Sequence, residues 1–199
     1  MSISLVLGLG NPGREYAETR HNIGWRLLDS LAAREGLTWK PQRDFQAEIT
    51  RWDRPDGRPV LLAKPQTFMN ASGDAARLLT SYFKVPNSKV AVVYDDLTID
   101  LGLIKVSLRG SAGGHNGLTD LMAKLGEGFV RFRLGIGPKH PPQMDLKDFV
   151  LGKFTPEQRL KVEELLPTYL SGLDLLLSNG PDRAMNLLNR RDKNETQQS

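Results

Sequence analysis

Blocks of apolar and polar positions along the chain predict its secondary structure. Residues 3–9, 89–94 and 132–136 are short runs rich in leucine and β-branched side chains, which is typical of buried strands. Residues 47–52 and 59–63 flank the turn sequence RPDG at 54–57 and predict a β-hairpin. Residues 103–108 alternate between apolar and polar side chains, so we expect a further strand there.

Apolar residues recur at helical spacing in residues 23–35, 71–83 and 118–125, and again from 155 onward. We expect Gly36 to end the first helix. The last begins with TPEQ at 155–158, a capping-box pattern with proline at the first helical position, and Pro167 should kink or break it. Helices and strands alternate, which predicts an α/β fold with a mixed twisted sheet and helices on both faces.

The length of 199 residues suits one sizeable core, and no repeat or linker divides the chain. We therefore expect one globular domain over residues 1–190, followed by a polar, frayed tail at 191–199. No apolar run approaches membrane-spanning length, and the first residues show no signal-peptide pattern. These features predict a cytoplasmic protein with no membrane partner.

The composition excludes several kinds of chemistry. The chain has no cysteine, which excludes disulfides, thiolate metal sites and cysteine nucleophiles. Its three histidines show no HExxH spacing, so zinc hydrolysis is disfavoured. The GxSxG elbow of serine hydrolases and the GxxxxGK[ST] P-loop are both missing from the sequence.

The net charge of +4 is mild but unevenly distributed. Between Gly102 and Pro142, six basic residues stand against only Asp120 and Glu127. The six are Lys105, Arg109, Lys124, Arg131, Arg133 and Lys139. This segment is a candidate phosphate-facing surface, although a solvated basic face explains the same charges.

Four polar clusters follow predicted strand ends or open predicted helices. They are Asn11 with Tyr16 and His21, then Phe68-Met69-Asn70, then Asp95-Asp96, and then GGHNG at residues 113–117. In an open α/β sheet, the loops beyond the carboxyl ends of the strands gather in one crevice. The sequence therefore predicts one site that contains a histidine, a carboxylate and several amides.

Each residue of these clusters has a functional and a structural interpretation. His21 could act as a general base or pack locally, and Asp95 could orient an imidazole or simply occupy a turn. Amide donors at Asn11, Asn70 and Asn116 could stabilise an oxyanion or make turns. Phe68 and Met69 could form an apolar wall or core, and we expect Asp96 to be solvated.

The run GLGNPG at residues 8–13 literally matches the dinucleotide-binding pattern GxGxxG. That pattern requires a helix that starts within the glycine run and an acidic residue after a second strand. Here the helical spacing starts only near Asn22, and the acidic residue is missing. A dinucleotide-dependent oxidoreductase is therefore the weaker alternative.

The motifs together resemble those of bacterial-type peptidyl-tRNA hydrolases, from about Leu5 through the C-terminal helices. They are GLGNPG at 8–13 with Tyr16 and TRHNIG at 19–24, KPQTFMNASG at 64–73, DDL at 95–97, GGHNGL at 113–118, RLGIG at 133–137 and FVLGKF at 149–154. Several separate motifs in the same order are far more specific than any one of them.

The resemblance implies a monomeric esterase that needs no metal or cofactor and cleaves peptide from tRNA. His21 would activate water, Asp95 would hold His21, and Asn11 would help to distinguish N-blocked peptidyl groups from free aminoacyl groups. Substrate contacts would come from Tyr16, Phe68, Asn70 and Asn116, with Met69 and His115 as neighbours. The basic segment would then hold the tRNA phosphates, with Lys105 and Arg133 among its contacts. A non-catalytic RNA-binding relative of the same fold is the alternative.

Overall fold

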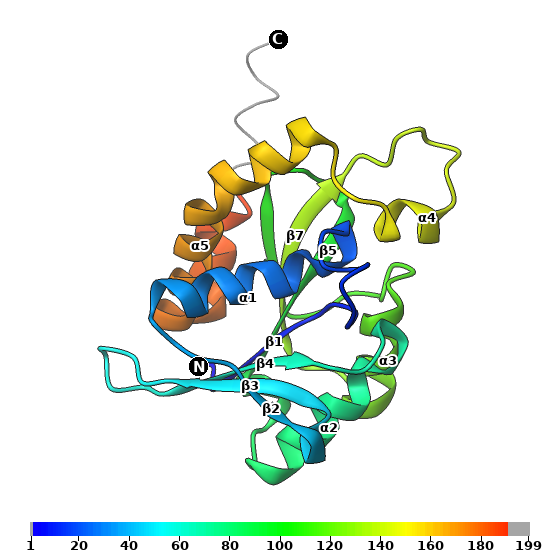
Figure 1. The fold of residues 1–199 in the computed structure, drawn as a ribbon. Coiled ribbons are helices and arrows are strands. Elements are labelled where there is room, and N and C mark those ends of the chain that lie inside the picture. Colours follow the sequence, from blue (N-terminus) through cyan, green and yellow to red (C-terminus); the bar gives the residue numbers. More distant parts are fainter. Residues whose placement is uncertain (1, 191–199) are drawn as a thin grey trace.

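The structure, a computed structural model, describes residues 2–190 and is built on one seven-stranded sheet (Figure 1). The strand order is β2-β3-β4-β1-β5-β7-β6. The strands are β1 (Leu5–Gly8), β2 (Lys40–Gln42), β3 (Ala47–Trp52), β4 (Val60–Pro65), β5 (Val90–Asp100), β6 (Ile104–Ser107) and β7 (Val130–Gly137). The central strands β4, β1, β5 and β7 are parallel, and antiparallel pairs flank them, so the predicted mixed sheet is confirmed.

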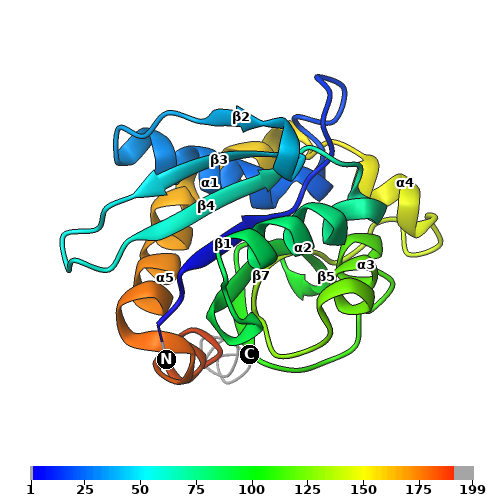
Figure 2. The ribbon, with the colours of Figure 1, turned by 90° about the horizontal axis from the view of Figure 1, so that it is seen from below.

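Helices cover both faces of the sheet, as the sequence predicted. α1 (Ile23–Arg34) and α5 (Pro156–Leu188) pack on one face, and α2 (Ser72–Tyr82) and α3 (Asn116–Leu125) pack on the other (Figures 1 and 2). Side chains alternate along β1, so that Val6 joins the core under α1 and α5 while Leu5 and Leu7 join the core under α2 and α3. Each face of the sheet therefore has its own apolar core.

Short elements gather where the parallel strands end. They are the 3₁₀ turns η1 (Arg20–Asn22) and η3 (Met69–Ala71), together with α4 (Leu146–Leu151), while η2 (Arg43–Phe45) and η4 (Asn87–Lys89) connect other elements. Gly24 allows the start of α1 to press against the sheet, because a Cβ there would lie 2.5 Å from the Val93 carbonyl oxygen. This close approach places η1, and with it His21, beside the end of β5.

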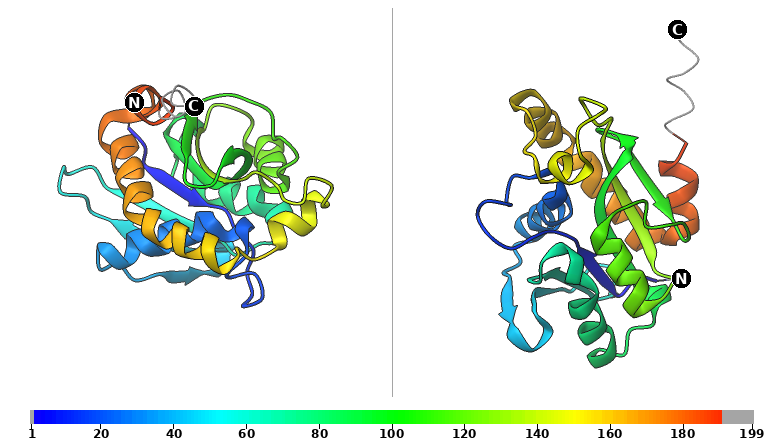
Figure 3. Two further views of the ribbon diagram at one scale, coloured as in Figure 1. Left: turned by 90° about the horizontal axis from the view of Figure 1, so that it is seen from above. Right: turned by 90° about the vertical axis from the view of Figure 1, so that its right-hand side faces the viewer.

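Figure 3 shows the start of β1 and the C-terminal end of α5 at the same end of the molecule, away from α4. The expected tail at 191–199 lies outside the described residues. Within residues 2–190, every helix is too short or too polar to cross a membrane.

Two expectations about the elements were wrong. β5 continues to Asp100 instead of ending at Tyr94, because it stays paired with β7 past Asp95 and Asp96 with a register shift. α5 runs through Pro167, and its non-helical residue is Gly180, with φ 82°. Proline has no N–H to donate to the carbonyl four residues earlier, which here belongs to Glu163. Glu163 is exposed, so water can hydrogen-bond to that carbonyl instead. β2 and α4 lie in segments where the sequence pattern predicted no helix or strand.

Candidate active site

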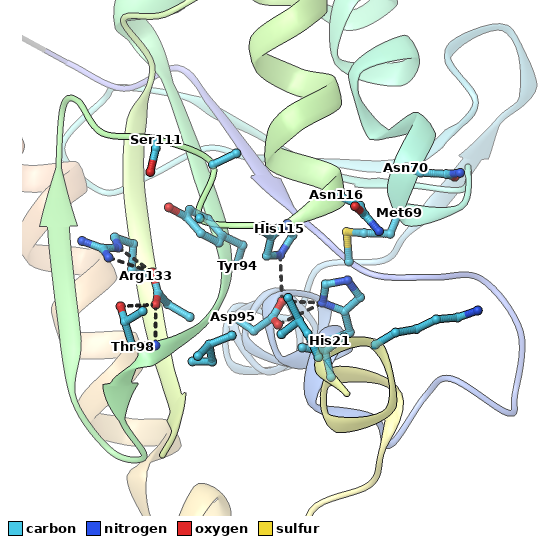
Figure 4. Close-up of a pocket in the computed structure, with 18 of the residues that line it drawn as sticks. His21, Met69, Asn70, Tyr94, Asp95, Thr98, Ser111, His115, Asn116 and Arg133 are labelled. Atoms are coloured by element: carbon cyan, nitrogen blue, oxygen red, sulfur yellow. Dashed lines mark hydrogen bonds and ion pairs between the residues drawn. The ribbon is translucent and has the colours of Figure 1, made fainter. Parts of the chain in front are cut away.

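His21 and Asp95 form a buried pair at the centre of the site (Figure 4). Nδ1 of His21, on η1, lies 2.9 Å from both carboxylate oxygens of Asp95, on β5. Only 6% of His21 and 2% of Asp95 is exposed. Because Nδ1 faces the carboxylate, it carries the proton in the neutral ring, and Nε2 is left as the basic nitrogen.

Burial and pairing act in opposite directions on the two groups. Burial alone would lower the pKa of His21, but the charge and hydrogen bonds of Asp95 outweigh it and raise that pKa above its ordinary value. For Asp95 the directions are reversed: burial alone would raise its pKa, but the imidazoles of His21 and His115 hold that pKa well below its usual range. Asp95 therefore stays ionised at neutral pH and stabilises a proton on His21.

Asn11 is fixed in place by hydrogen bonds from two directions. Its side-chain Oδ1 accepts from the backbone N–H of Met69 at 2.7 Å, which turns its Nδ2 donors away from Met69. Its backbone is gripped by Asn22, whose Oδ1 accepts from the Asn11 N–H and whose Nδ2 donates to the Asn11 carbonyl, both at 2.9 Å. Asn11 therefore offers an amide donor from a rigid loop beside His21.

His115 is the third residue on the Asp95 carboxylate. Its Nε2 lies 3.0 Å from Asp95 Oδ1, and its Nδ1 accepts from the backbone N–H of Leu118 at 3.2 Å, as the N-cap of α3. The His115 and His21 rings are 4.7 Å apart between centroids. Asp95 therefore connects two imidazoles that come from segments far apart in the sequence.

The nitrogen and oxygen atoms of His21, Asp95 and His115 lie within 4.8 Å of one another, close enough to consider a metal ion. A metal on Nε2 of His115 would force the ring proton onto Nδ1, where it would oppose the N–H of Leu118. Two donors would then face each other in a partly buried position. The hydrogen-bonding pattern therefore fits a proton-transfer site better than a metal site.

The pair opens into a pocket of about 750 Å³ that the four predicted polar clusters line together. Tyr16 and Phe68 meet edge to face at 6.3 Å, and Phe68 is 58% exposed, so these rings form a rim. Asn70 and Asn116 are exposed at the same opening. Met69 is 4% exposed and packs under α2 and α3, so it serves both the core and the pocket floor.

The predicted basic surface is divided. Arg109, Arg131 and Arg133 line the pocket, whereas Lys124 pairs with Asp74 and Asp120 on the helices α2 and α3. The remaining two of the six basic residues, Lys105 and Lys139, are not part of the pocket lining. Lys139 donates to the Met144 carbonyl, and Lys105 lies on β6 opposite Arg133.

The Arg133 guanidinium is held by the Asp96 carboxylate at 2.8 to 2.9 Å. The Asp96 side chain is only 13% exposed, so the expectation that it is solvated was wrong. The sequence shows both charges but not that neighbouring strands bring them together. Arg131 is buried and donates to the Ser111 carbonyl, which fixes the loop before His115. Arg109 is left as the exposed cation of the three.

Two features of the site were missed by sequence reasoning. One is Asn22, whose grip on Asn11 depends on a hydrogen bond across eleven residues. The other is the wall formed by α4, with Leu146, Val150 and Leu151. Arg20 attaches this wall to η1, because its guanidinium donates to the Phe149 carbonyl at 3.2 Å and to Gln158 at 3.1 Å.

A buried imidazole–carboxylate pair, surrounded by amides at the carboxyl ends of parallel strands, defines an α/β enzyme with a hydrolytic type of site. The family model described as peptidyl-tRNA hydrolase matches residues 5–197. The chain belongs to the peptidyl-tRNA hydrolase family and is thus a carboxylic ester hydrolase, which confirms the resemblance seen in the motifs.

Individual relatives agree over nearly the whole chain. The chain is 44% identical over 187 residues to a peptidyl-tRNA hydrolase of Chloroflexus aurantiacus, which covers 93% of this chain and 98% of that protein. It is 39% identical to the Gloeobacter violaceus protein of the same name, over 96% of each chain. The crystal structure of peptidyl-tRNA hydrolase from Acinetobacter baumannii has a TM-score of 0.87 and 34% identity, covering 94% of this chain and 95% of that one.

Proposed function

We propose that the chain hydrolyses the ester between the peptide and the tRNA in peptidyl-tRNA, releasing both and recycling the tRNA from abortive translation. The observation that carries this proposal is the His21–Asp95 pair, whose remaining imidazole nitrogen serves a pocket of about 750 Å³ lined by amides and aromatic rings. Family membership supports the same reaction. A pocket of this size accommodates the end of a nucleotide chain with the first residues of a peptide.

In the proposed mechanism, Nε2 of His21 takes a proton from water as the water attacks the ester carbonyl. Asp95 stabilises the imidazolium that forms, because it lies 2.9 Å from Nδ1 and stays ionised. General-base assistance of this kind contributes about 10²–10⁴ in rate. The ribose hydroxyl is a better leaving group than an amine, so this activation suffices for an ester.

Asn11 is the amide we assign to the substrate's acyl group. Because its Oδ1 is occupied by the Met69 N–H, its Nδ2 is free to donate to a carbonyl or a developing oxyanion. A donor at the carbonyl of an N-blocked residue would also distinguish a peptide group from a free, positively charged amine. Asn70 and Asn116 are assigned to further polar contacts, and Tyr16 and Phe68 to apolar ones.

The tRNA phosphates are assigned to the side of the pocket formed by β6, β7 and the loop between β6 and α3. Arg109 is exposed there, whereas a phosphate at Arg133 would compete with Asp96. We assign a weaker contact to Lys105, which neighbours Arg133 in the ladder. Binding should therefore weaken as salt rises, and substitutions at these residues should affect affinity more than chemistry.

We further propose that the enzyme works as a monomer, without a metal, in the cytoplasm where charged tRNA is found. A single sharp peak near 22.2 kDa in sedimentation, with full activity in a chelator, is the expected result. A dimer, or activity lost to chelation and restored by a metal, would contradict this part of the proposal.

The test is release of tRNA from an N-acetylated aminoacyl-tRNA, with the unblocked aminoacyl-tRNA and the His21→Ala variant alongside. Rapid cleavage of the blocked ester, slow cleavage of the free one and a folded but inactive variant are expected. A protein that binds tRNA but cleaves neither ester would instead be a non-catalytic RNA-binding relative.

A further inference from the structure

The tautomer of His115 is fixed by the end of a helix. As the N-cap of α3, its Nδ1 accepts the Leu118 N–H at 3.2 Å, so Nδ1 must be the unprotonated nitrogen of the ring. The proton therefore lies on Nε2, which donates to Asp95 Oδ1 at 3.0 Å. Leu118 thus determines, through one backbone N–H, which way the imidazole donates.

The surroundings of the His115 ring fix its orientation. Nδ1 faces the Leu118 N–H at the start of α3, and the ring lies 4.7 Å from the His21 ring between centroids. The other ring against His115 is Tyr94, edge-on at 5.1 Å, and burial raises the pKa of Tyr94 to about 12, so it stays neutral. Both ring nitrogens of His115 are therefore committed, Nδ1 to the Leu118 N–H and Nε2 to Asp95.

Asp95 Oδ1 is shared between the two histidines, since it lies 2.9 Å from Nδ1 of His21 and 3.0 Å from Nε2 of His115. A carboxylate that already accepts from a neutral N–H has less negative charge available for a neighbouring imidazolium. The other charged or titratable groups that line the pocket are Tyr16, Asp96, Arg109, Arg131, Arg133, Asp145 and Lys147. Arg133 is paired with Asp96. The charged group in direct contact with His21 is Asp95.

We propose that His115 is a positioning residue for the reaction: its Nε2–H holds Oδ1 of Asp95 and limits how strongly Asp95 retains the proton on His21. A general base must give up its proton after each cycle, and a carboxylate left entirely to His21 would hold that proton more strongly. This inference rests on the proposed function, but its structural half, the tautomer of His115, can be measured without any substrate.

The substrate-free test uses protein with ¹⁵N-labelled histidine, because only three histidines give signals and His140 serves as the internal reference. Two-bond proton–nitrogen spectra should show the neutral His115 ring with its proton on Nε2 and none on Nδ1. Recorded between pH 5 and 9, they should also show His21 passing from two protonated nitrogens to one. A His115 ring that is protonated at Nδ1 at neutral pH would overturn the proposal.

The kinetic test compares His115→Ala with His115→Gln, whose Nε2 amide reaches about as far as the imidazole Nε2. In the alanine variant, the acid limb of kcat/KM should move up by about 0.5–1 pH unit, with KM changing by less than about twofold. The glutamine variant should restore the limb, and His140→Ala, outside the pocket lining, should leave it unchanged.

A loss of activity in His115→Ala that is the same at every pH would mean that His115 only supports the fold, and would overturn the inference. The inference would also be overturned if the acid limb of kcat/KM in His115→Gln stayed at the pH found for His115→Ala. If the wild-type protein cleaves neither ester, the proposed function fails, while the nitrogen spectra still decide the tautomer on which the inference depends.

Discussion

Replacing Asp95 with asparagine tests the pair at the centre of the site with a change of one atom. Both carboxylate oxygens lie 2.9 Å from Nδ1 of His21, so an asparagine in the same rotamer must place its NH₂ against that nitrogen. The amide oxygen will occupy the Oδ1 position, because His115 donates there. Nδ1 must then accept a hydrogen bond, which moves the proton of His21 onto Nε2 and removes the base.

The expected loss of rate follows from the loss of general-base assistance by His21. General-base assistance is worth about 10²–10⁴ in rate, which corresponds to about 3–5 kcal/mol of transition-state stabilisation. The asparagine also removes the negative charge that raises the pKa of His21. We therefore expect Asp95→Asn to lower kcat on N-acetylated aminoacyl-tRNA by at least about 10²-fold at every pH between 6 and 9.

Single-turnover cleavage with saturating enzyme separates this loss from a loss of binding, which filter binding of uncharged tRNA measures independently. Asp100→Asn is the matched control, because Asp100 lies on the same strand but is exposed and outside the pocket lining. If the folded Asp95→Asn variant kept kcat within about fivefold of the control, the role assigned to the His21–Asp95 pair would be refuted.

Four further predictions follow from the contacts of the site. Since the pKa of His21 is raised, the acid limb of kcat/KM should have its midpoint above pH 6.5, and a limb below it would contradict the pairing. The stability that the protonated ring contributes should be fully present below about pH 6.5 and lost as pH rises through its folded pKa, as urea denaturation at several pH values would show. The side-chain amide of Asn22 makes two hydrogen bonds to the backbone of Asn11, and that of Asn189 makes two to the backbone of Val106, so Asn22→Ala and Asn189→Ala should each lower the free energy of unfolding by about 1–3 kcal/mol. Only Asn22→Ala should also lower kcat, and equal effects of the two variants on kcat would refute the positioning role of Asn22. Arg109→Gln should weaken tRNA binding and reduce the slope of log K against log salt by about 0.7–0.9, and an unchanged slope would remove Arg109 from the phosphate surface.

The convergence of the site was predictable because it follows from the topology. His21, Asp95 and Asn11 lie in segments that a parallel sheet must bring to one edge, and the structure places them there. Their hydrogen-bond partners were less predictable. That Asn11 uses its Oδ1 on Met69, and so presents its Nδ2, depends on a contact between residues 58 positions apart.

The errors have a common physical origin in long-range pairing. Asp96 appears solvated in the sequence because the strand that supplies Arg133 begins 34 residues later. α4 has only six residues, too few for a periodic pattern, and it is ordered by contacts with η1 and Arg20. Pro167 is tolerated within α5 because the carbonyl that loses its hydrogen-bond partner, that of Glu163, faces water. Whether that carbonyl is exposed depends on the tertiary structure, which a local sequence pattern does not show.

The attachment of Arg20 to Phe149 and Gln158 also has a consequence for how this chain is made. The partners of Arg20 follow it by 129 and 138 positions, so the pocket wall beside His21 leaves the ribosome long after His21 does. During synthesis the growing chain is itself a peptide esterified to tRNA, which is the bond it is proposed to cleave. Because of this order, the catalytic pocket stays incomplete until the chain has been synthesised past residue 158.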